Sequence, residues 1–181
     1  MKKYYFILML LTAPMAAYGQ TPPPAAHPLT AAQYLHLGNV SGRQAKYKDA
    51  ILNYTKAIQA DPGYSHAYYN RGFIYIKMRR YKLAIADLDK AIEIDPKYAA
   101  AYHVRGIAYF YKKKYAKAIA DYSKSIQLDP DNVRTYISRM SAYFKLNDYD
   151  KVWKDIIKIQ KLGGTVNPRI VNMLKDKKYR D

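Results

Sequence analysis

Histidine is the residue of this sequence most suited to metal binding or proton transfer, and the chain has four. His27 lies in a proline-rich segment, whereas His36, His66 and His103 are spread over a region in which the sequence repeats itself. These three hold different positions in the repeat, and neighbouring helices lie about 10 Å apart, so we do not expect their rings to converge on one ion. Cysteine is absent, which removes disulfides, thiol catalysis and thiolate metal ligands. We therefore predict no metal site and no cofactor.

Other catalytic patterns are missing from the sequence as well. No pair of carboxylates, no Ser–His pair and no glycine-rich phosphate loop stands in a suitable context. The two adjacent glycines, Gly163 and Gly164, indicate a turn between helices. The sequence therefore predicts a protein without enzymatic activity.

The elements that carry these residues repeat with a fixed period. Asp61-Pro62, Asp95-Pro96 and Asp129-Pro130 follow one another at 34-residue intervals. In each interval the apolar residues fall at helical spacing, which predicts two helices of about a dozen residues joined by a tight turn. We align rows of 34 and number the repeat positions 1–34 within each; the rows begin at Ala31, Ser65, Ala99 and Val133. Position 8 is Gly and position 20 is Ala in three of the four rows, which lets paired helices approach closely, and Pro at position 32 ends the second helix.

This pattern resembles the tetratricopeptide repeat (TPR) family, whose 34-residue motif is Trp-x-x-Leu-Gly-x-x-Tyr followed by Ala, Phe, Ala and Pro. The resemblance covers residues 31–164 and implies an all-α fold, a right-handed α-solenoid of antiparallel helix pairs. It also implies a noncatalytic scaffold for protein–protein interaction. The residues that match the motif are Tyr34, Leu37, Gly38, Ala50, Tyr54, Ala57, Pro62, Tyr68, Gly72, Tyr75, Ala84, Leu88, Ala91, Pro96, Tyr102, Gly106, Tyr109, Ala118, Tyr122 and Pro130.

The fourth row departs from the motif, because Met140, Val152 and Ile159 replace its small residues. We expect a wider helix pair there, followed by a capping helix whose apolar side covers the end of the stack. The predicted organisation is a signal peptide (1–19), a Pro/Ala-rich tether (20–30), three TPRs (31–64, 65–98, 99–132), a degenerate fourth TPR (133–164), and a capping helix with a basic tail (165–181).

The first residues have the pattern of an export signal. Lys2 and Lys3 precede an apolar run, and Ala17-Tyr18-Gly19 offers small residues for cleavage before Gln20. We predict an exported protein, periplasmic or secreted. The alternative is an uncleaved membrane anchor, which the short, Pro14-interrupted apolar stretch disfavours.

The TPR resemblance implies that the first helix of each repeat lines a concave groove. In one subgroup a clamp of cations and asparagines holds chaperone C-termini; here Asn39 and Asn70 fit it, but Leu35, Ala100 and Val104 replace the cations. The groove positions include no acidic residue, so we predict binding of a protein or an extended peptide, with acidic peptides among the candidates. The predicted groove residues are His66, Tyr69, Asn70, Phe73, Lys77, His103, Ile107, Phe110, Tyr111, Arg134, Ser138 and Ser141.

Positive charge dominates the chain, which carries a net +17, or +15 without residues 1–19. Much of it falls in the turn inside each repeat, which predicts a basic rim of Lys46, Arg79, Arg80, Lys112, Lys113 and Lys114. Two interpretations stay open. The cations could complement helix C-termini and aid solubility, or they could adhere to an acidic protein, an envelope polyanion or a membrane surface. Nucleic acid is not expected because of the export signal, and the oligomeric state is left open.

Overall fold

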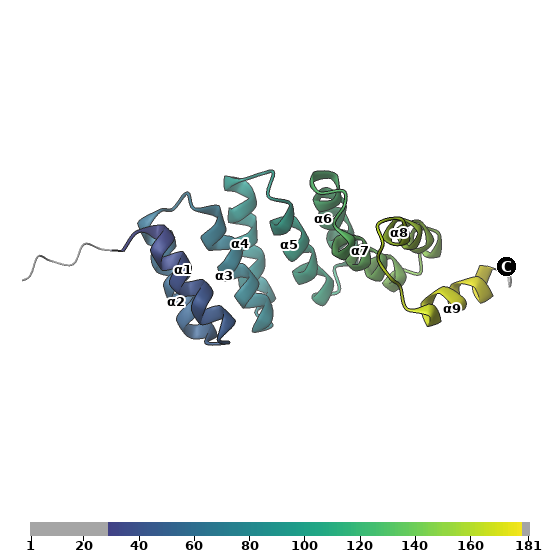
Figure 1. Cartoon of the computed structure of the whole chain (residues 1–181), viewed down its shortest axis with the longest axis horizontal. Helices are drawn as coiled ribbons and strands as arrows, with labels where there is room; N and C mark the ends of the chain where they lie inside the picture. Colours follow the sequence, from purple (N-terminus) through teal and green to yellow (C-terminus); the bar gives the residue numbers. More distant parts are fainter. Residues whose placement is uncertain (1–28, 179–181) are drawn as a thin grey trace, which may run out of the picture.

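The computed structural model describes residues 29–178, with side chains through Leu174. The predicted signal peptide and residues 20–28 of the tether lie outside this range. The described residues form helices only, and consecutive antiparallel pairs stack into an elongated α-solenoid (Figure 1). This confirms the predicted fold class. The helices are α1 (Ala31–Arg43), α2 (Tyr47–Ala60), α3 (Ser65–Lys77), α4 (Tyr81–Ile94), α5 (Ala99–Tyr111), α6 (Tyr115–Leu128), α7 (Val133–Lys145), α8 (Tyr149–Lys161) and α9 (Pro168–Lys178).

The Asp-Pro pairs end the second helix of repeats one to three. Asp61 is the C-cap residue of α2. Its backbone is extended because the helical conformation is disfavoured for a residue that precedes proline. Its carboxylate accepts the backbone N–H of Gly63 at 2.9 Å, and Asp95 accepts that of Lys97 at 3.0 Å. Each aspartate thus ends one helix and fixes the turn that leads into the next.

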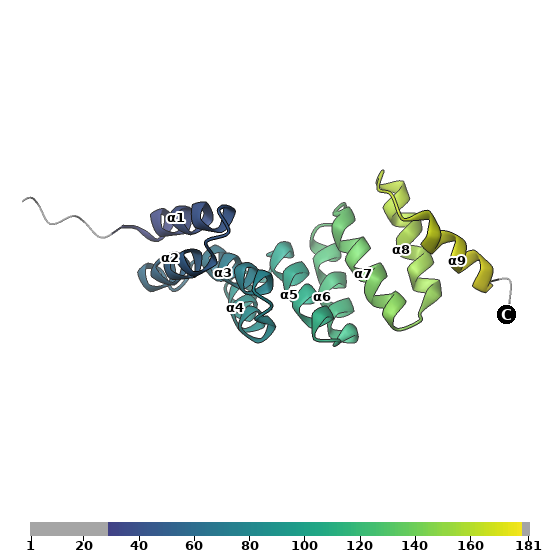
Figure 2. The same cartoon turned by 90° about the horizontal axis from the view of Figure 1, so that it is seen from below.

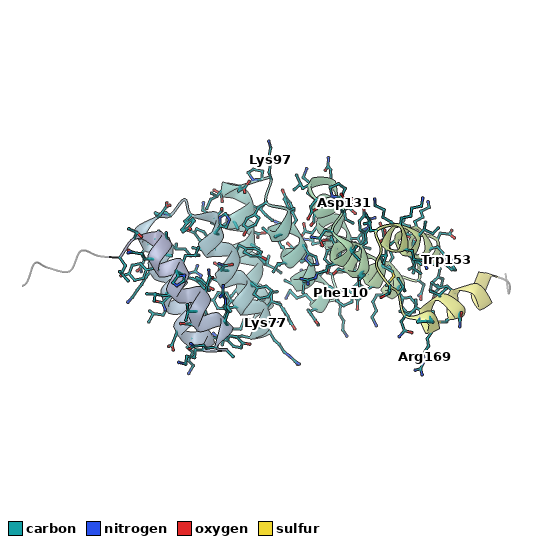
Figure 3. The ribbon with its side chains drawn as sticks, viewed as in Figure 1. Lys77, Lys97, Phe110, Asp131, Trp153 and Arg169 are labelled. Atoms are coloured by element: carbon teal, nitrogen blue, oxygen red, sulfur yellow. The ribbon has the colours of Figure 1, made fainter. Side chains whose placement is uncertain are left out.

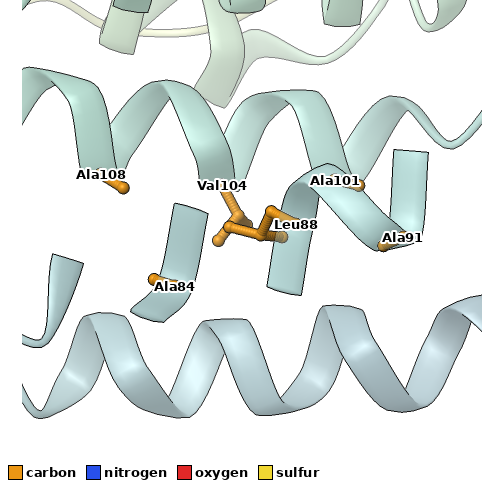
Figure 4. Close-up of a cluster of buried hydrophobic side chains, with 6 residues drawn as sticks. All are labelled: Ala84, Leu88, Ala91, Ala101, Val104 and Ala108. Atoms are coloured by element: carbon orange, nitrogen blue, oxygen red, sulfur yellow. The ribbon is translucent and has the colours of Figure 1, made fainter. Parts of the chain in front are cut away.

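Small residues allow the helices to pack closely. A side chain at Gly106 would place its Cβ 2.6 Å from Cε1 of Tyr122, and one at Gly38 would overlap the Tyr54 ring. Between repeats, α4 and α5 meet through a layer made mostly of alanines, with Leu88 and Val104 in contact at its centre (Figure 4). The residues of this layer, all buried, are Ala84, Leu88, Ala91, Ala101, Val104 and Ala108.

A ladder of arginine–aspartate pairs joins the two helices of each of repeats two to four. Nε and Nη2 of Arg105 donate to both carboxylate oxygens of Asp121 at 2.9 and 2.7 Å, and Nη1 reaches back to Asp89 of the preceding repeat at 2.7 Å. The same bidentate geometry joins Arg71 to Asp87 and Arg139 to Asp155. The ladder therefore ties each helix pair together and binds it to the one before. The sequence analysis did not identify it.

The two ends of the stack differ. Leu174 of α9 is buried against α7 and α8, so α9 covers part of the C-terminal end, where it lies beyond α8 (Figure 2). At the other end α1 is the first helix of the described residues, and Leu37 and Val40 are about two-fifths exposed there. Helix α1 runs to the same repeat position as α3, α5 and α7. No helix within residues 29–178 is long and apolar enough to cross a bilayer.

The turn inside each repeat contains one residue in the left-handed region. Ala45, Arg79, Lys113 and Asn147 hold this place with φ between 56° and 58°. A residue with a Cβ atom pays about 1–2 kcal/mol there, whereas Asn tolerates the conformation better and Gly adopts it freely. Three of the four turns therefore carry a residue that is locally unfavourable.

Replacing Lys113 by Gly should stabilise the fold by about 0.5–1 kcal/mol, because relief of the left-handed conformation outweighs the added freedom of the unfolded chain. Denaturant unfolding measures the change. Lys112→Gly is the control, since it removes the same charge at a residue whose φ is −79°. Equal stabilisation by both substitutions would show that charge, not backbone conformation, is responsible.

Truncating Arg105→Ala should destabilise the fold by about 3–5 kcal/mol, because Asp121 would stay buried without its partner. Lys90→Ala, which removes an exposed pair with Glu93, should change stability by less than about 1 kcal/mol. The double variant Arg105→Met/Asp121→Leu should recover most of the loss. A double variant as unstable as Arg105→Ala alone would contradict this explanation.

Candidate functional site

The concave face between α5 and α7 holds a pocket of about 260 Å³. It gathers five predicted groove residues: Ile107, Phe110 and Tyr111 from α5, and Ser138 and Ser141 from α7. Tyr122 and Ile137 complete the lining. The surface is mostly apolar, with serine hydroxyl groups along one side, and Tyr111 is 59% exposed. This arrangement suits an extended chain that brings an apolar side chain and hydrogen-bonding groups.

A second pocket, of about 330 Å³, adjoins the first and shares Phe110 and Ser141 with it. Its other lining residues are Met140, Phe144, Lys145 and Ile170. Figure 3 labels Phe110 near the middle of the length of the solenoid. The sequence analysis did not select Met140, Phe144 or Ile170. Phe144 could have been found, since it holds the same repeat position as Phe110.

The predicted groove residues of α3 lie apart from these pockets. The rings of His66 and Tyr69 pack against Tyr98, with centroids 5.0 and 4.9 Å away, and burial raises the pKa of Tyr69. Phe73 is 38% exposed, and Nζ of Lys77 lies 5.2 Å from its ring centroid. The predicted groove therefore has two parts. One is an aromatic surface with Lys77 on α3, and the other is the pair of pockets lined by α5, α7 and α9.

Asn70 donates from Nδ2 to Oδ1 of Asn39 at 3.0 Å, and the hydroxyl of Tyr54 donates to the same oxygen at 2.9 Å. The two asparagines of the clamp pattern thus bond to each other. Val104, at one of the clamp's cation positions, is buried in the layer between α4 and α5. The concave face is therefore not arranged as a two-carboxylate clamp.

His103 links α5 to α7 at the rim of the first pocket. Its Nε2 lies 3.1 Å from Oγ of Ser138, which donates to the carbonyl oxygen of Arg134 at 3.0 Å. Because the hydroxyl proton of Ser138 is used in this way, Nε2 of His103 is the donor in the first bond. Burial lowers the pKa of His103 below its ordinary 6.5, and the charge of Arg134 lowers it further. His103 therefore joins α5 to α7 beside the first pocket through its bond to Ser138.

The residues of the basic rim all lie in the turns inside the repeats. Lys112 is half-buried and the other five are exposed; within the described residues none of the six side chains makes an ion pair. Figure 3 shows Lys77 at this edge of the solenoid and Lys97 and Asp131 at the opposite edge. The opposite rim carries Asp61, Asp95, Asp129 and Asp131, interrupted by Lys97.

Half of these cations lie between the C-terminus of one helix and the N-terminus of the next, and their backbone N–H groups bond carbonyl oxygens of the preceding helix. Lys46, Arg80 and Lys114 are the N-cap residues of α2, α4 and α6, where the positive end of the helix dipole lies. None of the three provides a side-chain cap hydrogen bond. Among the described residues no group of three or more potential metal ligands comes together.

The fold and its concave face define a helical-repeat protein, and comparison with known proteins identifies which kind. Family models described as tetratricopeptide repeat match residues 34–64, 65–98 and 99–132. The chain belongs to the tetratricopeptide repeat family, a family of interaction modules. A search of curated proteins found no match.

Solved structures of TPR proteins are similar to this chain. A crystal structure of MamA is 28% identical with a TM-score of 0.70, covering 74% of this chain and 78% of MamA. The first TPR domain of Spaghetti (RPAP3), bound to the HSP90 peptide SRMEEVD, is 30% identical with a TM-score of 0.64, covering 65% of this chain and 93% of that one. The Arabidopsis OM64 TPR domain is 25% identical with a TM-score of 0.63, covering 64% and 95%.

The lowered pKa of His103 predicts that this residue makes the fold less stable in mild acid. The unfolded chain takes up the proton near pH 6.5, whereas folded His103 resists it, so its contribution is present above pH 6.5 and lost as pH falls below it. Urea unfolding between pH 7.5 and 5 should show a loss that His103→Gln reduces. The matched control is exposed His36→Gln, which should leave the profile unchanged; equal profiles for all three proteins would contradict the assignment.

Proposed function

We propose that this chain is a noncatalytic scaffold that binds a protein or peptide on its concave face, at the two joined pockets between α5, α7 and α9. The observation that carries the proposal is that the two pockets adjoin: they share Phe110 and Ser141, and together they are called the trough here. Exposed aromatic side chains in a concave surface are typical of the anchoring points of protein interfaces.

The charges in and around the two pockets favour an acidic ligand. Neither pocket has an acidic lining residue, Lys145 lines the second, and Arg134 and Lys77 are exposed on α7 and α3. The similar RPAP3 domain binds the peptide SRMEEVD, which is acidic. Because the clamp cations are replaced in this chain, we propose that apolar anchoring in the trough contributes more of the affinity here.

We also propose that the protein is exported and meets its partner in the cell envelope, as the pattern of residues 1–19 indicates. A second candidate function is adhesion of the basic rim to an anionic envelope polymer or membrane. It is favoured by the six rim cations, which have no ion-pair partner among the described residues.

The first proposal is tested by a photo-crosslinking side chain at Ile137, which is 37% exposed at the first pocket, with Leu52 on α2, 54% exposed, as the control position. In envelope extracts, Ile137 should capture a partner that Leu52 does not. Phe110→Ala/Phe144→Ala should abolish the capture, because the trough loses its aromatic walls.

Ser141→Phe is the matched variant, since it fills the shared wall of both pockets without removing an aromatic residue. It should also abolish capture, while circular dichroism shows an intact fold. Capture of the same proteins by wild type and by both variants would show that the trough is not the binding surface.

A further inference from the structure

The turns inside the repeats place cations where the fold itself favours other residues. In the second and third repeats the left-handed residue is Arg79 or Lys113, and the helix cap that follows is Arg80 or Lys114. The first residue of each pair carries the strain of a positive φ. The second faces the positive end of a helix dipole and leaves its N–H groups uncapped.

The fourth repeat shows the locally favoured solution at the same two positions. Asn147 takes the left-handed conformation, which Asn tolerates, and Asp148 caps α8. Its carboxylate accepts the backbone N–H of Lys151 at 3.3 Å and pairs with the Lys151 ammonium at 2.6 Å. Compared with this pair, repeats two and three have a less favourable residue in the left-handed conformation and lack the side-chain cap.

Sites that break a local stability rule without a compensating contact are expected where function requires the residue. The side chains of Arg79, Arg80, Lys113 and Lys114 make no ion pair in the part of the chain that the structure describes. By contrast, Arg71, Arg105 and Arg139 are all fixed by aspartates. The rim cations are therefore available to an outside partner, as are other unpaired lysines such as Lys77 and Lys97, and the strained backbone at Arg79 and Lys113 is what distinguishes the rim.

Exposed apolar side chains accompany these cations along the same edge. Leu83 in the first turn of α4, Tyr111 at the end of α5 and Leu146 after α7 are 46%, 59% and 49% exposed. Tyr111 stacks on Tyr81 of the preceding repeat, with ring centroids 5.2 Å apart and an angle of 7°, which joins two turns into one surface. Cations mixed with exposed leucine and tyrosine are typical of surfaces that lie at a lipid headgroup boundary.

We infer that this edge is a peripheral binding surface for anionic membranes, with cations contacting lipid phosphates and Leu83, Tyr111 and Leu146 entering the headgroup region. The inference rests on the proposed rim adhesion and names its partner. None of the rim cations lines a pocket of the concave trough, and Tyr111 is a residue that the two surfaces share. A soluble polyanion would use the cations but gain nothing from the apolar side chains.

The test measures binding to vesicles of 70% phosphatidylcholine and 30% phosphatidylglycerol, with pure phosphatidylcholine vesicles and polyglutamate as comparisons. The rim variant Arg79→Asn/Arg80→Asp/Lys113→Asn/Lys114→Asp copies the Asn-Asp pair of the fourth repeat into two turns. It should bind anionic vesicles at least roughly 100-fold more weakly, since each basic residue near such a surface contributes several-fold. It should also melt roughly 2–5 °C higher, because both turns are relieved of strain.

The matched control removes the same charge away from this edge: Lys97→Asn/Lys161→Asn/Lys56→Asp/Lys124→Asp. It should keep most of the vesicle binding. A second variant, Leu83→Ser/Leu146→Ser, should weaken vesicle binding roughly tenfold and leave polyglutamate binding unchanged.

Equal vesicle binding by the rim variant and the control would overturn both the inference and rim adhesion. If the rim variant loses vesicle and polyglutamate binding but Leu83→Ser/Leu146→Ser binds vesicles like wild type, the membrane inference is wrong and adhesion to a polyanion stands. A rim variant that is less stable than wild type would remove the argument that these cations are held against local stability.

Discussion

The structure depends on how closely the paired helices approach one another. A glycine against the ring of Tyr54 or Tyr122 and a layer of fully buried alanines leave no room for larger side chains between the helices. Packing of this kind fixes each helix relative to the next, and a 34-residue period then repeats the geometry along the stack. The buried arginine–aspartate ladder holds the same pairs in register. Because these two sets of contacts are internal, the remaining side chains are free to differ from repeat to repeat.

The regular stack gives the molecule three surfaces with different chemistry. The first helices present an aromatic and apolar concave face, the turns inside the repeats form a basic edge, and the Asp-Pro turns form an edge that is mainly acidic. The acidic edge has a structural role, since two of its aspartates accept backbone N–H groups of their own turns. The six cations of the basic edge, by contrast, make no ion pair within the described residues.

Sequence was sufficient for the fold because the repeat period, the helical spacing and the Gly and Ala positions are local patterns that recur. The sequence predicted only part of the candidate binding site. The resemblance placed Phe110, Tyr111 and Ser141 on the concave face, but the gathering of Phe144, Met140 and Ile170 beside them depends on how α9 packs. The arginine–aspartate ladder was missed because its partners are 16 residues apart on different helices. The cap positions of Arg80 and Lys114 likewise became visible only once helix ends were defined.

The central claim is that two surfaces, which meet at Tyr111, bind two kinds of partner. Hydrogen–deuterium exchange of the whole protein, with anionic vesicles and with the crosslinked envelope partner in turn, tests it most directly. The account predicts that vesicles protect the turns around Arg79–Arg80 and Lys113–Lys114, and that the partner protects the amides of α5 and α7 around Phe110 and Ser141. Protection of one and the same surface by both ligands, or of neither surface by either, would contradict it.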